Sequence, residues 1–171
     1  MPLKRRIIIV ISVLWLGFVL SISFMEAWLK FQAEGVTQGI GLSVGKLVFG
    51  TLNKVEIFFL LVLFASSFKR YWYLPKKTLK YTLIGLVIIV LLQTFHLLPI
   101  LDQRADMIIR GEQPSPSYFH FYYVVLEICK VFMLSLFIHL TLVKYNDEIV
   151  PRIKEKRITK NTSIKKNLAC K

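Results

Sequence analysis

The sequence has little acidic charge and almost no cysteine. Ten Asp and Glu residues stand against 23 Lys and Arg in a chain of 171 residues, and there are two cysteines. Cys129 lies inside an apolar run and Cys170 near the basic C-terminus, so the spaced pairs of a disulfide framework or a zinc knuckle are missing. A phosphate-binding loop and a nucleophile-and-base signature are missing as well. These absences give no support to a hydrolase or a thiol oxidoreductase and favour a non-enzymatic protein.

Apolar residues, in contrast, are abundant. They make up 55% of the chain, and the mean hydropathy is +0.57 although the net charge is +13. A soluble core of this size cannot hide so much apolar surface, and a disordered basic protein would not contain it. High hydropathy with a positive excess is typical of a membrane protein whose charges lie outside the bilayer. We therefore expect an integral membrane protein, with the lipid bilayer as its main partner.

The hydrophobic pattern predicts an all-α fold, an antiparallel bundle of four transmembrane helices. The first uncharged run, Ile7 to Phe24, has no A-x-A cleavage site after it, so we interpret it as a retained helix and not as a signal peptide. Tyr81 to Leu101 is a second long run without a charge. The predicted helices are residues 7–29, 47–68, 81–101 and 118–143; residues 1–143 form the membrane domain and residues 144–171 a basic cytoplasmic tail.

The second and fourth helices are too short if they exclude polar residues. The uncharged run Ile57 to Phe68 contains 12 residues, which is about 18 Å of helix against a hydrocarbon thickness of about 30 Å. The run Val131 to Val143 is similarly short. Crossing the membrane therefore requires extension back to Leu47 and to Tyr118. These extensions place several polar side chains inside the bilayer: Asn53, Lys54, Glu56, His120, Glu127 and Lys130.

The positions of the basic residues predict the orientation. Seventeen of the 23 lie before the first helix, between the second and third helices, or after the fourth helix. These three regions share one side of a four-helix topology, and the positive-inside rule makes that side cytoplasmic. Both termini are therefore predicted to be cytoplasmic, with the tail held against anionic lipid. Because topology accounts for the basic excess, we do not expect nucleic-acid binding.

Five of the eight glycines lie between Gly35 and Gly50. Within this stretch, Gly41-x-x-x-Gly45 has the small-residue spacing that permits close helix approach in membranes. Tight packing is the favoured interpretation, and a re-entrant or hinged entrance to the second helix is the alternative. The polar segment from Asp102 to Ser117 is expected to be a surface loop, with partner contact as one role for it.

Polar residues recur at helical spacing on every predicted helix. Intervals of three or four residues place such residues on one helix face, and ionisable groups in membranes face neighbouring helices and not lipid. We therefore expect one polar cluster in the outer half of the membrane. Its predicted members are Glu26, Asn53, Glu56, Gln93, His96, His120, Tyr123, Glu127 and Lys130.

Three functions compete for this cluster. It can be a hydrogen-bonded network that only fixes helix register, in a structural subunit of a membrane complex. It can handle protons, cations or a small solute, as intramembrane carboxylates often do in transporters, and this is the preferred function. No cofactor is predicted by that function. The redox alternative is a haem held by His96 and His120, or a transition metal held by Glu26, Glu56, Glu127 and His96.

Two segments resemble a known family. They are Ser23-Phe-Met-Glu26-Ala-Trp-Leu-Lys30-Phe31 and Gly45-Lys-Leu-Val-Phe-Gly50-Thr-Leu-Asn53-Lys-Val-Glu56. They look like segments of the small four-helix bacterial membrane proteins grouped as the domain of unknown function 4149 type. The resemblance covers about a third of the chain. It implies a four-helix inner-membrane fold and a connection to metals, and it transfers no catalytic residues. A membrane-protein partner or a homo-oligomer is also compatible with the sequence.

Overall fold

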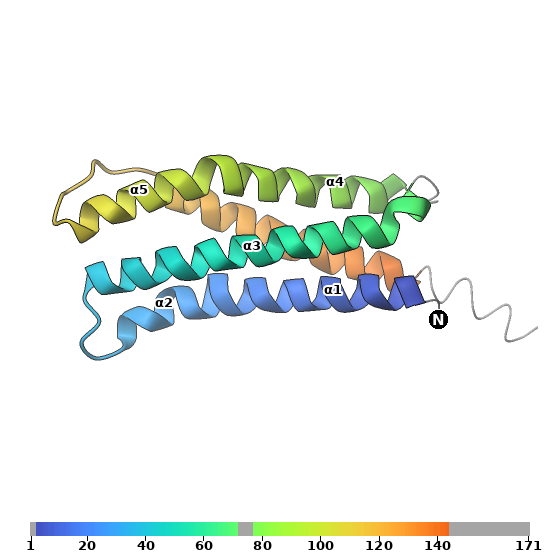
Figure 1. Ribbon diagram of the computed structural model, residues 1–171, viewed down its shortest axis with the longest axis horizontal. Helices are drawn as coiled ribbons and strands as arrows, with labels where there is room; N and C mark the ends of the chain where they lie inside the picture. The colour runs from blue at the N-terminus through green and yellow to red at the C-terminus, as the bar shows by residue number, and fades with distance from the viewer. Residues whose placement is uncertain (1–2, 72–76, 144–171) are drawn as a thin grey trace, which may run out of the picture. The chain divides into compact units, whose positions relative to one another are not determined.

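The computed structural model describes residues 3–71 and 77–143. The predicted basic tail, with Cys170, lies outside the described residues. All regular structure in the described part is helical, which confirms the expected all-α class. The elements are α1 (Leu3–Val19), the π-helix η1 (Leu20–Glu26), α2 (Ala27–Leu29), the 3-10 helix η2 (Lys30–Gln32), α3 (Gln38–Tyr71), α4 (Lys77–Leu92), the π-helix η3 (Gln93–Leu97), α5 (Leu98–Ile109) and a last helix at Phe119–Val143 (Figure 1).

Four stretches of the described chain are long and apolar enough to cross a membrane. They are Arg6–Gln32, Gln38–Ser66, Lys77–Ile109 and Phe119–Val143, with 27, 29, 33 and 25 residues. Each exceeds the roughly 20 residues that a spanning helix needs. The prediction of four apolar spans is therefore confirmed.

The second span begins earlier than predicted. Helix α3 starts at Gln38 and runs without a break to Tyr71, whereas the sequence suggested a start at Leu47. In this added part of α3, glycines let side chains of the first span lie directly against the helix backbone. A Cβ on Gly41 would collide with the Phe31 ring, and one on Gly45 would lie 2.9 Å from Lys30 Nζ. The glycine spacing thus serves close packing, and the continuous helix leaves no re-entrant entrance there.

The third span is also longer, because the expected loop at 102–117 is helical as far as Ile109. An ion pair to α3 holds this extension: Lys46 Nζ donates to both carboxylate oxygens of Asp106, at 2.7 and 2.6 Å. Gly111 follows the end of the helix, and its φ of 82° is in the left-handed region that glycine adopts without strain. The N–H of Glu112 donates a hydrogen bond to the Met107 carbonyl at 2.9 Å and so caps the C-terminal end of the helix. The loop is therefore only the segment after this cap.

The chain divides into two compact units, residues 1–138 and residues 139–171. In the first unit α1 packs against α3, and α3 contacts α4 and α5 (Figure 1). Its core includes Val19, Leu52, Leu86 and Leu134, each almost inaccessible to solvent. Many large apolar side chains point outward instead; Phe95, for example, is 76% exposed. An apolar exterior around a packed core suits contact with hydrocarbon. Of the second unit, the described part is the end of the last helix, where His139 is exposed.

Two π-helical turns interrupt the first and third spans. The N–H of Ala27 bonds to the Ile22 carbonyl, and the N–H of Leu98 bonds to the Gln93 carbonyl, each five residues back. Pro99 follows the second turn and has no N–H to offer the preceding helical turn, which favours a local change of hydrogen-bond pattern. A π-helical turn changes the direction in which neighbouring side chains point. In η3, Gln93 is one of the two buried residues.

Candidate functional site

Five buried side chains meet between the spans of the first unit, and we call them the buried cluster. The tryptophan comes from α1, one glutamate from α3, the glutamine from η3, and the lysine and second glutamate from the last helix. Every member is at most 1% exposed. Each span therefore contributes at least one polar group to a single site. The members are Trp15, Glu56, Gln93, Glu127 and Lys130.

Lys130 is the centre of the cluster. Its Nζ donates to Glu56 Oε1 at 2.6 Å and to Glu127 Oε1 at 2.9 Å. The Glu127–Lys130 pair is local, at i and i+3 on one helix face, whereas the Glu56–Lys130 pair joins α3 to the last helix. A buried ammonium is tolerated only with such partners. The lysine therefore connects the two carboxylates through direct hydrogen bonds.

Each carboxylate receives a second donor on the same oxygen. Trp15 Nε1 donates to Glu56 Oε1 at 2.9 Å, and Gln93 Nε2 donates to Glu127 Oε1 at 2.8 Å. Each Oε1 atom thus accepts two hydrogen bonds, and one of the two comes from a cation. Hydrogen bonds with an ionised partner are stronger than neutral ones. The arrangement stabilises negative charge on both Oε1 atoms.

The other side of the cluster is short of donors. Glu56 Oε2, Glu127 Oε2 and Gln93 Oε1 are buried and have no hydrogen-bond partner among the described residues. With both carboxylates ionised, the cluster also has two negative charges against one positive charge. A buried acceptor without a donor costs roughly 1–3 kcal/mol, and an unmatched buried charge costs more. One proton on a carboxylate oxygen would neutralise the excess charge and add a donor.

Asn53 and Glu26 lie outside this cluster. Asn53 Nδ2 donates to Thr94 Oγ1 at 2.9 Å, and Thr94 in turn donates to the Val90 carbonyl, so this pair ties α3 to the third span. Glu26 accepts from Lys30 Nζ at 3.2 Å within one helical turn, and its side chain is 26% exposed. The expectation that Glu26 joins the two deeper glutamates is therefore corrected. The reason is that a lysine four residues away satisfies it locally.

The two histidines proposed as iron ligands are not drawn into the buried cluster. His96 is an exposed residue of η3, and His120 is exposed near the start of the last helix. In residues 3–71 and 77–143, no three His, Cys, Asp or Glu side chains group closely enough to hold a metal ion. The haem or metal site therefore remains a prediction without a ligand set in the described residues.

A cavity of about 500 Å³ lies among η1, α2, α3, α5 and the last helix. Tyr123 and His120 both line it. Tyr123 is 4% exposed and meets Phe49 edge to face, with ring centroids 5.6 Å apart. It also lies one helical turn before Glu127. Two of the predicted site residues thus border the cavity, and Tyr123 is the buried one, on the helix face that leads to the buried cluster.

Trp15 and Thr94 are site residues that the sequence analysis missed. Trp15 lies well inside the first uncharged run, where its large apolar body gives no sign of a polar role. The available signal is its indole N–H, since a buried tryptophan usually has a hydrogen-bond acceptor. Thr94 stands beside Gln93 and bonds to its own helix at Val90, so its contact with Asn53 follows no sequence spacing.

Comparisons with known proteins assign neither a family nor a function to this chain. Searches against protein-family models, curated proteins and solved structures give no match for this chain. The resemblance of residues 23–31 and 45–56 to a family of unknown function accordingly remains a prediction. A functional proposal rests on the geometry of the site.

Proposed function

We propose that the protein is a small, non-enzymatic membrane protein, transporter-like or an accessory subunit, whose buried cluster exchanges a proton. The observation that carries this proposal is the sharing of one ammonium by two fully buried carboxylates. When both carboxylates are ionised, the cluster has one negative charge in excess. The Oε2 atoms of the two glutamates have no hydrogen-bond donor among the described residues. A proton is small enough to meet both needs without extra room. Carboxylates that bind and release protons are common on intramembrane transport paths.

The proposed exchange uses two equivalent protonation states. In one state Glu56 holds the proton and Glu127 pairs with Lys130; in the other the two glutamates change roles. Lys130 bonds to both carboxylates in either state, so it lowers the cost of moving charge from one helix to the other. Because both oxygens that would take the proton are buried, the exchange with solution needs a path through the protein.

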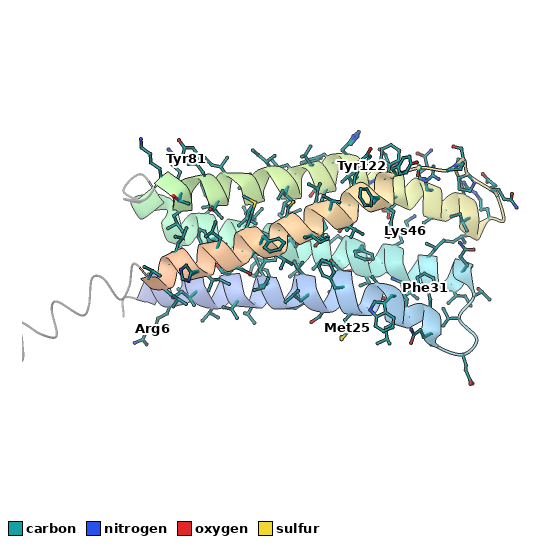
Figure 2. All side chains as sticks on the ribbon, turned by 180° about the vertical axis from the view of Figure 1, so that it is seen from behind. Arg6, Met25, Phe31, Lys46, Tyr81 and Tyr122 are labelled. Carbon is teal, nitrogen blue, oxygen red and sulfur yellow. The ribbon has the colours of Figure 1, made fainter. Side chains whose placement is uncertain are left out.

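The proposed topology is an antiparallel bundle in a bacterial inner membrane, with both termini cytoplasmic. Support comes from the basic residues that precede the first span, separate the second from the third, and follow the fourth. In the first unit Arg6 and Tyr81 lie toward one end of the helices, and Phe31 and Lys46 lie toward the other (Figure 2). The basic tail is proposed to contact anionic lipid.

Proton flux into proteoliposomes tests the function. The full chain is reconstituted with a pH-sensitive dye inside the vesicles, and a pH gradient is applied with potassium and valinomycin to remove the electrical limit. We expect flux from the native chain, and loss of that flux in Glu56→Gln and in Glu127→Gln, because each leaves a neutral cluster with no proton to exchange.

Glu26→Gln is the matched control, because it makes the same chemical change in a carboxylate outside the cluster. It should retain the flux of the native chain. Flux that is unchanged in both cluster variants would contradict the proposal. Absence of flux in the native chain would do so as well, and the hydrogen-bonded network would then be the better account of these residues.

A further inference from the structure

The cavity beside the buried cluster has the size and lining of a ligand site. At about 500 Å³ it falls within the range of roughly 300–1,000 Å³ that is usual for small-molecule pockets. Its walls are mainly aromatic and aliphatic, and they come from all four spans. Examples are Phe24, Trp28, Phe31, Phe49 and Leu101. A ligand with a substantial apolar body would fit such walls.

The charges at the cavity leave one carboxylate unmatched. Lys30 and Lys46 line the cavity, but each already has a carboxylate partner outside the lining, Glu26 and Asp106 respectively. Asp102 also lines the cavity. Among the described residues, no hydrogen bond or ion pair involves its side chain. Lys46 attracts the Asp102 carboxylate, but this lysine is bonded to Asp106, which repels that carboxylate. The local balance is therefore one negative charge in excess.

The aromatic walls already hold a cation. Lys30 Nζ lies 5.6 Å from the centroid of the Phe31 ring and 5.2 Å from that of Phe49. Such distances allow the ring faces to attract a positive charge. A second polar group is available as well, because the hydroxyl of Ser23 borders the cavity and is buried without a hydrogen-bond partner. The lining can thus contact an apolar body, a positive charge and one polar atom.

We propose that this cavity binds a small hydrophobic organic cation. Aromatic side chains contact its body, and Asp102 balances its charge. An anionic ligand is disfavoured because both lysines are already neutralised by their own partners. The proposal goes beyond proton exchange and does not depend on it, since binding in the cavity needs no change in the protonation of Glu56 or Glu127.

Two probes of the same shape and opposite charge test the site. Tetraphenylphosphonium and tetraphenylborate are dialysed to equilibrium against the full chain in a neutral detergent, and uptake by protein-free micelles is subtracted. We expect saturable binding of the cation, close to one per chain, and no saturable binding of the anion. Both measurements are made at one pH without a gradient, so they are unaffected if proton exchange fails.

Variants locate the site. Asp102→Asn should weaken cation binding about tenfold, since it removes the unmatched charge, and Asp102→Glu should restore most of it. Glu112→Gln removes the same charge from a residue that is bonded to exposed Arg110 outside the cavity, and it should leave binding unchanged. Equal binding of both probes, or unchanged cation binding in Asp102→Asn with native elution and circular dichroism, would overturn the proposal.

Discussion

At the residue scale, Lys130 determines whether the buried cluster can exist. Replacing it by methionine keeps most of the side-chain length but leaves Glu56 and Glu127 buried without a cation. Removing one partner of a buried ion pair typically costs about 3–5 kcal/mol. We expect Lys130→Met to lower the free energy of unfolding by about that amount, measured by denaturant titration in detergent.

The control for this change is Lys46→Met. Lys46 also bonds to a carboxylate, but that pair is partly exposed, with side chains 35% and 44% accessible. Partly exposed pairs contribute only about 0–1 kcal/mol. Equal losses in Lys46→Met and Lys130→Met would show that burial of the cluster has no special energetic weight.

Glu56→Gln separates proton exchange from a purely structural network. The amide oxygen still accepts from Trp15 and Lys130, and the remaining Glu127–Lys130 pair is neutral overall. We therefore expect the free energy of unfolding to change by no more than about 1 kcal/mol, while proton flux is lost. A structural network that needs both negative charges predicts a much larger loss of stability.

At the element scale, the glycines of α3 determine how closely the end of the first span approaches it. Gly41→Leu would push against the Phe31 ring, whereas Gly39 has nothing within 4 Å of an added Cβ. Overpacking costs about 1–3 kcal/mol. We expect a loss of that size for Gly41→Leu and none for Gly39→Leu, measured by thermal unfolding. Comparable losses in both would contradict the packing role of Gly41, because leucine has a higher helix propensity than glycine and an unobstructed helical position should lose no stability.

Element positions were easier to predict than element ends. Two long uncharged runs and two shorter runs, extended to the length that a bilayer requires, identified all four spans. The start of α3 was placed nine residues too late because Leu47 already gave a helix long enough to cross the membrane, and span length sets only a minimum. The helical continuation past Asp102 was missed since it depends on the Lys46–Asp106 pair, which joins distant parts of the chain. The π-helical turns gave no periodic signal.

Helical spacing alone could not determine which polar residues meet. The forced burial of Glu56, Glu127 and Lys130 followed from span length, and these residues do lie together. Glu26 shares their spacing but pairs with a nearby lysine. Trp15 enters the cluster through an indole N–H that hydropathy does not count. Whether a polar residue joins the cluster depends on how each helix is rotated about its own axis. A single sequence does not specify that rotation.

At the scale of the whole molecule, the proposed orientation would account for the excess of basic residues. We expect Cys170 in the basic tail to react with a membrane-impermeant maleimide only after intact cells are opened, in a Cys129→Ser background. A Glu112→Cys variant that also lacks Cys170 should react in intact cells, because residue 112 lies in the loop between the third and fourth spans. Labelling of Cys170 from outside would reverse the proposed topology.

An exchangeable proton in the buried cluster is the central feature of the proposed function, and infrared difference spectroscopy detects such a proton. Spectra of the reconstituted protein in neutral and alkaline buffers should differ by the carbonyl-stretch band of a protonated carboxyl group, shifted in D₂O. Exposed carboxyl groups are ionised in both buffers and do not contribute to this difference. The account predicts that this band is present in the native chain and in Glu26→Gln, and disappears in Glu56→Gln and Glu127→Gln. A band that persists in both cluster variants, or is absent from the native chain, would contradict it.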